Sequence, residues 1–99
     1  MRQGTTPTIR IKVPNVDLKR FKSLYVIFEQ GSNILKKETD DLEIVDNEIR
    51  CTLTQEETLN FKEGKCNIQL RAMTIENVAV ASAIKVVQVY RVLDKDVIT

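Results

Sequence analysis

Apolar and polar residues alternate along most of this chain, and this period of two predicts β-strands rather than helices. The clearest alternation lies in residues 48–54, whose apolar face is formed by Ile49, Cys51 and Leu53. A second run over residues 65–73 repeats the pattern, with an apolar face formed by Cys66, Ile68, Leu70 and Ala72. Both runs therefore predict strands that bury one side against a core.

The residues between these two runs predict a short helix. Thr54 can accept a hydrogen bond from the backbone of Glu57 while the Glu57 carboxylate reaches back to Thr54, which is a capping box. We expect about two turns, because Gly64 suits a left-handed residue at the C-terminal end of the helix. Leu59 and Phe61 are then placed to fill the end of the core. A strand, a short helix and a strand in the opposite sheet form the E-to-F crossing of an immunoglobulin-like sandwich.

Strand-like runs recur about every ten to fifteen residues, the spacing expected of a sandwich. They cover residues 8–13, 23–30, 33–39, 42–45, 48–54, 65–73 and 78–92. Gly31 suits the positive φ of a hairpin turn, Asp17 is a candidate N-cap, and residues 1–7 form a polar lead-in that is expected to be loosely held. The predicted fold is one all-β domain over residues 1–99, a seven-stranded immunoglobulin-like antiparallel β-sandwich with one short helix at the E-F crossing.

The last run, residues 78–92, has an irregular phase. Ile84 and Val86 fit one face, whereas Val87 and Val89 fit the other. Two adjacent valines indicate either a β-bulge that shifts the register or a strand that is covered on both sides. Cover on both sides would require a partner subunit, and the candidate protein interface would then include Val87, Val89 and Arg91.

The amino-acid composition favours no particular class of partner. Fifteen basic and fourteen acidic residues leave a net charge of +1, so no overall field favours nucleic acid or an anionic membrane. No apolar run is long enough for a signal peptide or a membrane span, and we expect a soluble chain made in the cytoplasm. Cys51 and Cys66 both fall on inward faces. They are expected to be free thiols, with a disulfide or a metal site as the less favoured alternatives.

Residues that commonly carry chemistry are sparse. The chain has no histidine, the commonest general base and metal ligand. Its three glycines form no phosphate-binding loop, and pairs such as Asp40–Asp41 suit solvated turns. We therefore expect no catalytic residues, no cofactor and no metal. The aromatic residues are scattered at core-like positions rather than grouped in a platform: Phe21, Tyr25, Phe28, Phe61 and Tyr90.

Four segments carry a resemblance to a known group of proteins. They are RQGTTPTIRIKVP, YVIFEQG followed by ILKK, DLEIVDNEIRCTLTQEETLNFKEGKCNIQLR, and IKVVQVYRVLDKDVI. Together they resemble small proteins from phages and prophages of Gram-positive bacteria, which are similar to the immunoglobulin-like N-terminal domain of phage upper baseplate proteins. The resemblance covers nearly the whole chain, and its motifs are structural.

The resemblance implies a noncatalytic phage or prophage structural or assembly protein. Such a protein would be made in the bacterial host cytoplasm and reside in the virion, in a baseplate or tail. Its partners would be other phage structural proteins or further copies of itself, with no nucleic acid and no membrane. The alternative from the residues is a stand-alone module that binds a glycan or a peptide through the loops Gln30–Asn33 and Glu76–Asn77.

Overall fold

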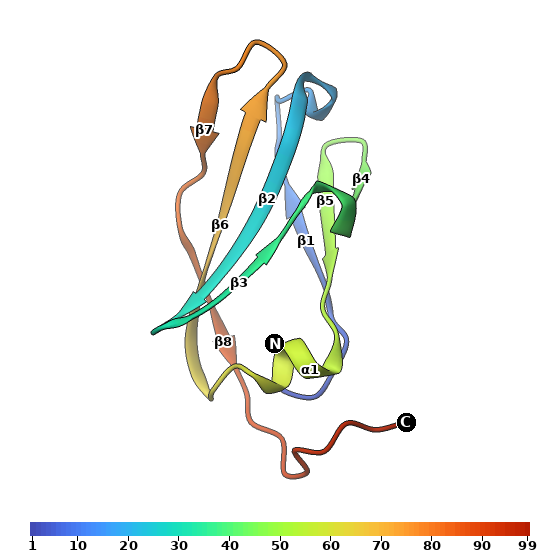
Figure 1. Cartoon of the computed structure of the whole chain (residues 1–99), viewed down its shortest axis with the longest axis vertical. Coiled ribbons are helices and arrows are strands. Elements are labelled where there is room, and N and C mark those ends of the chain that lie inside the picture. Colours follow the sequence, from blue (N-terminus) through green and yellow to red (C-terminus); the bar gives the residue numbers. More distant parts are fainter.

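The computed structural model describes all 99 residues, which form two antiparallel sheets packed against each other (Figure 1). The smaller sheet has the order β1–β5–β4, with bounds Thr8–Lys12, Glu48–Thr52 and Leu42–Val45. The larger sheet begins with the order β3–β2–β6, with bounds Asn33–Lys37, Phe21–Gln30 and Gly64–Thr74. Beyond β6 lie two short strands, β7 (Ala79–Ala81) and β8 (Lys85–Val89). The predicted all-β sandwich is confirmed, and six of the seven predicted runs match strands to within two residues.

The core lies between the sheets, and the alternation of each strand decides which side chains enter it. From the larger sheet the buried inward side chains are Leu24, Val26, Phe28, Cys66, Ile68 and Val89. From the smaller sheet and its exit they are Ile49, Cys51 and Leu53. Phe61 closes one end, with its ring centroid 6.1 Å from that of Phe28. The expectation that Phe61 fills this end of the core is therefore confirmed.

The chain crosses between the sheets through α1 (Gln55–Leu59), which joins β5 to β6. Thr54 and Glu57 form the predicted capping box. The helix has only five residues, fewer than the two turns expected, and Asn60 ends it in a right-handed conformation. Gly64 has a φ of 132° but begins β6 instead of ending the helix. The role predicted for Gly64 is therefore wrong, although its conformation still favours glycine.

The last predicted strand is split in two. β7 and β8 both pair with β6, but two residues separate Ile68 from Arg71 while three separate their partners Lys85 and Ala81. The extra residue shifts the register by one, as a β-bulge does. The single strand predicted over 78–92 is therefore wrong in its continuity, and the bulge that its phase indicated is present.

The first residues of the chain are held firmly. Arg2 pairs with Tyr90 in a parallel bridge, the Tyr90 N–H donates to the carbonyl of Met1 at 2.8 Å, and the Gln3 N–H donates to the carbonyl of Tyr90 at 2.9 Å. The Gln3 side chain is buried and donates to the carbonyl of Phe61. The loosely held lead-in expected for residues 1–7 is thus wrong for its first three residues, which extend the edge beside the end of β8.

Some of the smaller expectations are confirmed and one is wrong. Asp17 caps the 3-10 turn η1 (Leu18–Arg20) by accepting from the Lys19 N–H at 3.0 Å, as predicted. Gly31 has a φ of 59°, in the left-handed region that its hairpin turn requires. Tyr90 is 50% exposed, so its assignment to a core-like position is wrong. No helix in the structure has the length and apolar character needed to span a bilayer.

Candidate functional site

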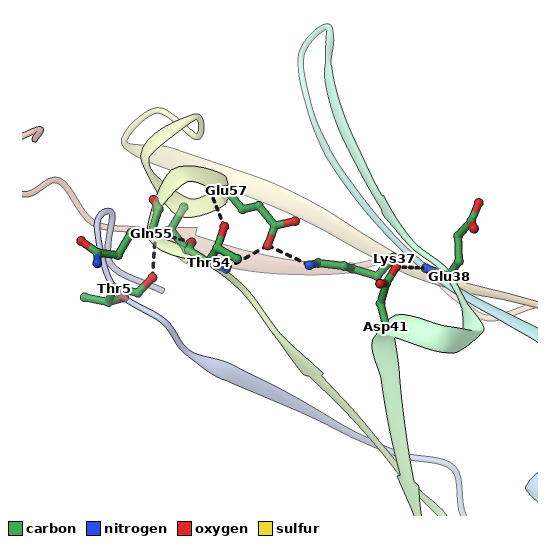
Figure 2. A network of polar contacts seen from close by, with 8 residues as sticks. Thr5, Lys37, Glu38, Asp41, Thr54, Gln55 and Glu57 are labelled. Atoms are coloured by element: carbon green, nitrogen blue, oxygen red, sulfur yellow. Dashed lines mark hydrogen bonds and ion pairs between the residues drawn. The ribbon is translucent and has the colours of Figure 1, made fainter. Parts of the chain in front are cut away.

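A polar network joins the two sheets at the corner around α1 (Figure 2). The Glu57 N–H donates to the Thr54 hydroxyl at 3.1 Å, and the Thr54 N–H donates to the Glu57 carboxylate at 2.8 Å. The same carboxylate lies 2.7 Å from the Lys37 ammonium at the end of β3. Burial alone would raise the pKa of Glu57, but the hydrogen bonds from Lys37 and Thr54 outweigh it and the pKa is lowered. This ion pair therefore clamps α1, the crossing between the sheets, to the end of β3 in the larger sheet.

The acidic pair Asp40–Asp41 lies in the turn η2 (Thr39–Asp41) that follows β3. The backbone N–H of Glu38 donates to the Asp41 carboxylate at 3.1 Å, so this carboxylate holds its own turn (Figure 2). The structure contains no group of three or more His, Cys, Asp or Glu side chains that could hold a metal ion. The Asp41 carboxylate thus has a local structural role in its own turn.

Cys51 and Cys66 are buried free thiols, as expected. Burial raises the pKa of Cys51 to about 11 and raises that of Cys66 in the same direction. A reactive cysteine requires the opposite, an accessible thiol with a lowered pKa. These two side chains are therefore part of the core.

A groove of about 740 Å³ lies between β1 and the edge formed by β7 and β8. Its apolar floor comes from β1, β6 and β8 and consists of Ile9, Ile11, Val13, Ile68, Leu70 and Val87. The groove is open because β1 pairs only with β5, and because Ser82 and Ala83 on the opposite wall are too small to fill the space. We call this feature the inter-sheet groove.

The charges along the inter-sheet groove are mainly positive. Arg10, Lys12 and Lys85 line it, together with a single carboxylate, Glu48. Glu48 accepts a hydrogen bond from Arg50 at 2.7 Å, which is the main cause of its lowered pKa, and Arg10 and Lys12 lower that pKa further. An apolar floor with a net positive rim favours an occupant that combines apolar and acidic side chains.

Exposed apolar side chains gather in the C-terminal quarter of the chain. Of the twelve large apolar side chains that are exposed, nine lie after β6: Ile75, Val78, Val80, Ile84, Val86, Tyr90, Leu93, Val97 and Ile98. Several exceed half exposure, with Leu93 at 86% and Ile98 at 71%. These exposed side chains are apolar area that a protein partner can cover.

The structure separates the three residues of the predicted interface. Val87 is half-buried in the wall of the inter-sheet groove. Val89 is 0% exposed and belongs to the core, so its assignment to a surface contact is corrected. Arg91 is exposed, and its carbonyl accepts a hydrogen bond from Arg2 at 2.8 Å. The bulge explains the change, because it turns Val89 toward the core and leaves Val86 outside at 57% exposure.

The two loops of the alternative ligand-binding hypothesis lie at opposite ends of β2. Gln30 and Asn33 fasten the first loop, since their side-chain amides donate to the carbonyls of Lys62 at 2.7 Å and Asn60 at 3.0 Å. In the second loop, Glu76 forms an ion pair with Arg20 at 2.9 Å. The register of β2 with β6 keeps the loops far apart, so they do not form one site.

Sequence reasoning missed the inter-sheet groove. The alternation of Ile9 and Ile11 predicted their inward direction, but not that no strand would lie beside β1. One signal was present in the small residues AVASA over 79–83, which cannot fill a sandwich edge as larger residues do.

No family model, curated protein or solved structure matches this chain.

Proposed function

We propose that this protein is a noncatalytic assembly module that acts through contacts between copies of itself. The observation that carries the proposal is that nine of the twelve exposed large apolar side chains lie after β6, in a chain that also has an open apolar groove. Monomeric proteins rarely leave such surfaces uncovered. A partner that covers them removes apolar area from water, which is the main favourable term in association.

The proposed setting is the virion of a phage or prophage, with synthesis in the bacterial host cytoplasm. Support comes from the resemblance of four segments, including the strand YVIFEQG and the corner LTQEETLNFKEG, to small phage proteins and to the N-terminal domain of upper baseplate proteins. Baseplates and tails are built from repeated copies of small domains. A domain that self-associates through one edge suits that task, and further phage structural proteins are its proposed additional partners.

The test is the solution mass of the purified protein, measured by light scattering from low to high micromolar concentration. We expect a mass that rises with concentration or a stable closed oligomer. A strict monomer over the whole range would contradict the proposal. Far-UV circular dichroism on the same samples ensures that any added mass belongs to folded protein.

A module that binds cell-wall sugars has less support. Sugar sites usually offer free aromatic faces, but the Lys36 ammonium lies 4.4 Å from the centre of the Tyr25 ring and the Arg2 guanidinium lies 5.5 Å from that of Tyr90. These cations lie over both tyrosine rings of the chain. A clear rise in melting temperature on addition of cell-wall sugars, combined with a strict monomer, would favour that function over assembly.

A further inference from the structure

The inter-sheet groove lies where an immunoglobulin-like sandwich has another strand. The order β1–β5–β4 corresponds to strands B, E and D, and the order β3–β2–β6–β8 corresponds to C′, C, F and G. In that fold strand A lies beside strand B, but β1 has no neighbour on this side. The groove is therefore the space of a missing strand, bordered by the unpaired backbone of β1.

The opposite wall also offers unpaired backbone. Along β8 the Met1 amino group donates to the carbonyl of Gln88 at 2.9 Å, and the Tyr90 N–H donates to Met1. Since alternate residues of a strand face the same side, the backbone of Val86 faces this edge too, but it lies beyond the reach of residues 1–3. β7 and the start of β8 pair only with β6. An extended segment can thus pair with either wall.

We propose that residues 93–98 of a second copy, which we call the C-terminal segment, occupy the inter-sheet groove as an added strand. This contact rests on the proposed function, because it specifies the two surfaces through which copies associate. Because the groove of one copy takes the segment of the next, the contact is heterologous and generates a ring or an open chain of copies.

The side chains of the C-terminal segment match the groove. In an extended segment Leu93 and Val97 share one face, which can cover the apolar floor. Asp94 and Asp96 share the other face and would meet the cationic rim formed by Arg10, Lys12 and Lys85. Lys95 lies on the same face of the segment as Leu93. Glu48 is the one carboxylate that lines the groove, and Lys95 can form an ion pair with it.

The lengths also agree. The wall formed by β1 and its exit runs from Ile9 to Pro14, and the segment runs from Leu93 to Ile98. Six extended residues span about 20 Å in each case. A segment of this length can therefore follow the whole wall.

In its own chain the C-terminal segment runs from the end of β8 past α1, away from the groove (Figure 1). Three hydrogen bonds hold it there: Ile98 exchanges two with the Gln55 side chain, at 2.8 and 2.9 Å, and the Lys95 ammonium donates to the side-chain oxygen of Gln3. Leu93 remains 86% exposed. The segment is thus available to a second copy once these three hydrogen bonds are released.

Charge reversal on each surface tests the contact. Variant R10E/K85E makes the groove acidic, and variant D94K/D96K makes the segment basic. Each is expected to weaken self-association by about tenfold or more, because like charges then face each other. The fold should tolerate both changes, since all four side chains are exposed and Arg10 lies opposite another cation, Arg50, in the register of β1 with β5.

Mixing the two variants gives the decisive result. Each variant supplies the charge that the other lacks, so an equimolar mixture is expected to regain the association constant of the wild-type protein. Variant K62E/K65E changes the net charge by the same amount as R10E/K85E at exposed positions away from the groove. It is expected to associate as the wild type does at equal ionic strength.

The remaining outcomes separate the two proposals. Undiminished association of both charge variants, or no recovery on mixing, would overturn the segment-in-groove contact while leaving self-assembly through another surface in place. A wild-type protein that stays monomeric would overturn both.

Discussion

The centre of the larger sheet and its outer edge show the same alternation of apolar and polar residues, but their apolar side chains differ in how far they are exposed. In β2 the inward residues Leu24, Val26 and Phe28 are at most 3% exposed, because β6 and the smaller sheet cover them. Along β7 and β8 the apolar residues Val80 and Val86 are 41% and 57% exposed. Alternation therefore predicts that a strand forms, whereas only the neighbours of that strand decide whether its apolar residues are covered.

This difference divides the molecule into a closed part and an open part. The closed part comprises the core and the corner clamped by Lys37 and Glu57. The open part comprises the inter-sheet groove, β7, β8 and the C-terminal segment. We expect substitutions in the closed part to change the free energy of unfolding, and substitutions in the open part to change association between copies.

The largest expected effect comes from a charge placed on the core-facing side of β8. Val89→Lys puts an ammonium into the core, where no acidic partner is available, and should cost about 5 kcal/mol or more. A typical domain has only about 5–15 kcal/mol of stability, so we expect a largely unfolded protein, measured by circular dichroism and urea titration.

Val86→Lys is the matched control for that prediction, because it lies three residues away on the other face of the same strand at 57% exposure. It should leave the free energy of unfolding within about 0.5 kcal/mol of the wild type, and weaken association if the open edge carries the contact. Equal stability of the two lysine variants would remove the distinction between the closed and open parts.

Local signals were predictable from the sequence, and long-range pairing was not. The capping box of Thr54 and Glu57 and the cap at Asp17 each depend on residues within three positions of each other, so the sequence contained both partners. The ion pair of Glu57 with Lys37 joins residues twenty positions apart and could not be read from either segment. The groove could not be predicted for the same reason, because the alternation within β1 is the same whether or not another strand lies beside it.

The phase of the last strand shows where the limit lies. Adjacent Val86 and Val87 indicated a bulge or a second cover, and the bulge is present. Which valine enters the core depends on the position of the extra residue between Ala81 and Lys85, and that is set by pairing with β6. The sequence thus indicated an irregularity but could not place Val89 inside and Val86 outside.

A second prediction concerns the pH dependence of the closed part. The pKa of Cys51 is about 11 in the folded chain against an ordinary value of 9.0. The unfolded chain therefore releases this proton first as the pH rises. Stability that is fully present below about pH 9 falls between pH 9 and 11, by at most about 2.7 kcal/mol from this thiol.

Urea titrations of the wild type and Cys51→Ala at pH 8, 9.5 and 10.5 isolate that contribution, since other groups titrate equally in both proteins. The stability advantage of the wild type should shrink as the pH rises. A constant advantage would show that Cys51 does not titrate differently in the folded and unfolded chains. Cys66→Ala should show a change of the same sign, because burial raises the pKa of Cys66 too.

The smallest effect is expected at the corner. Thr54→Ala removes the hydroxyl that accepts the Glu57 N–H at 3.1 Å, and loss of such a cap costs about 0.5–2 kcal/mol. Thr6→Ala changes an exposed threonine outside any helix or strand and should cost less than about 0.5 kcal/mol. If the corner belongs only to the closed part, Thr54→Ala should lower the midpoint of urea unfolding without altering the mass that light scattering gives for the folded protein. A change in both would mean that the corner contributes to the contact between copies, and the boundary between the two parts would then have to include α1.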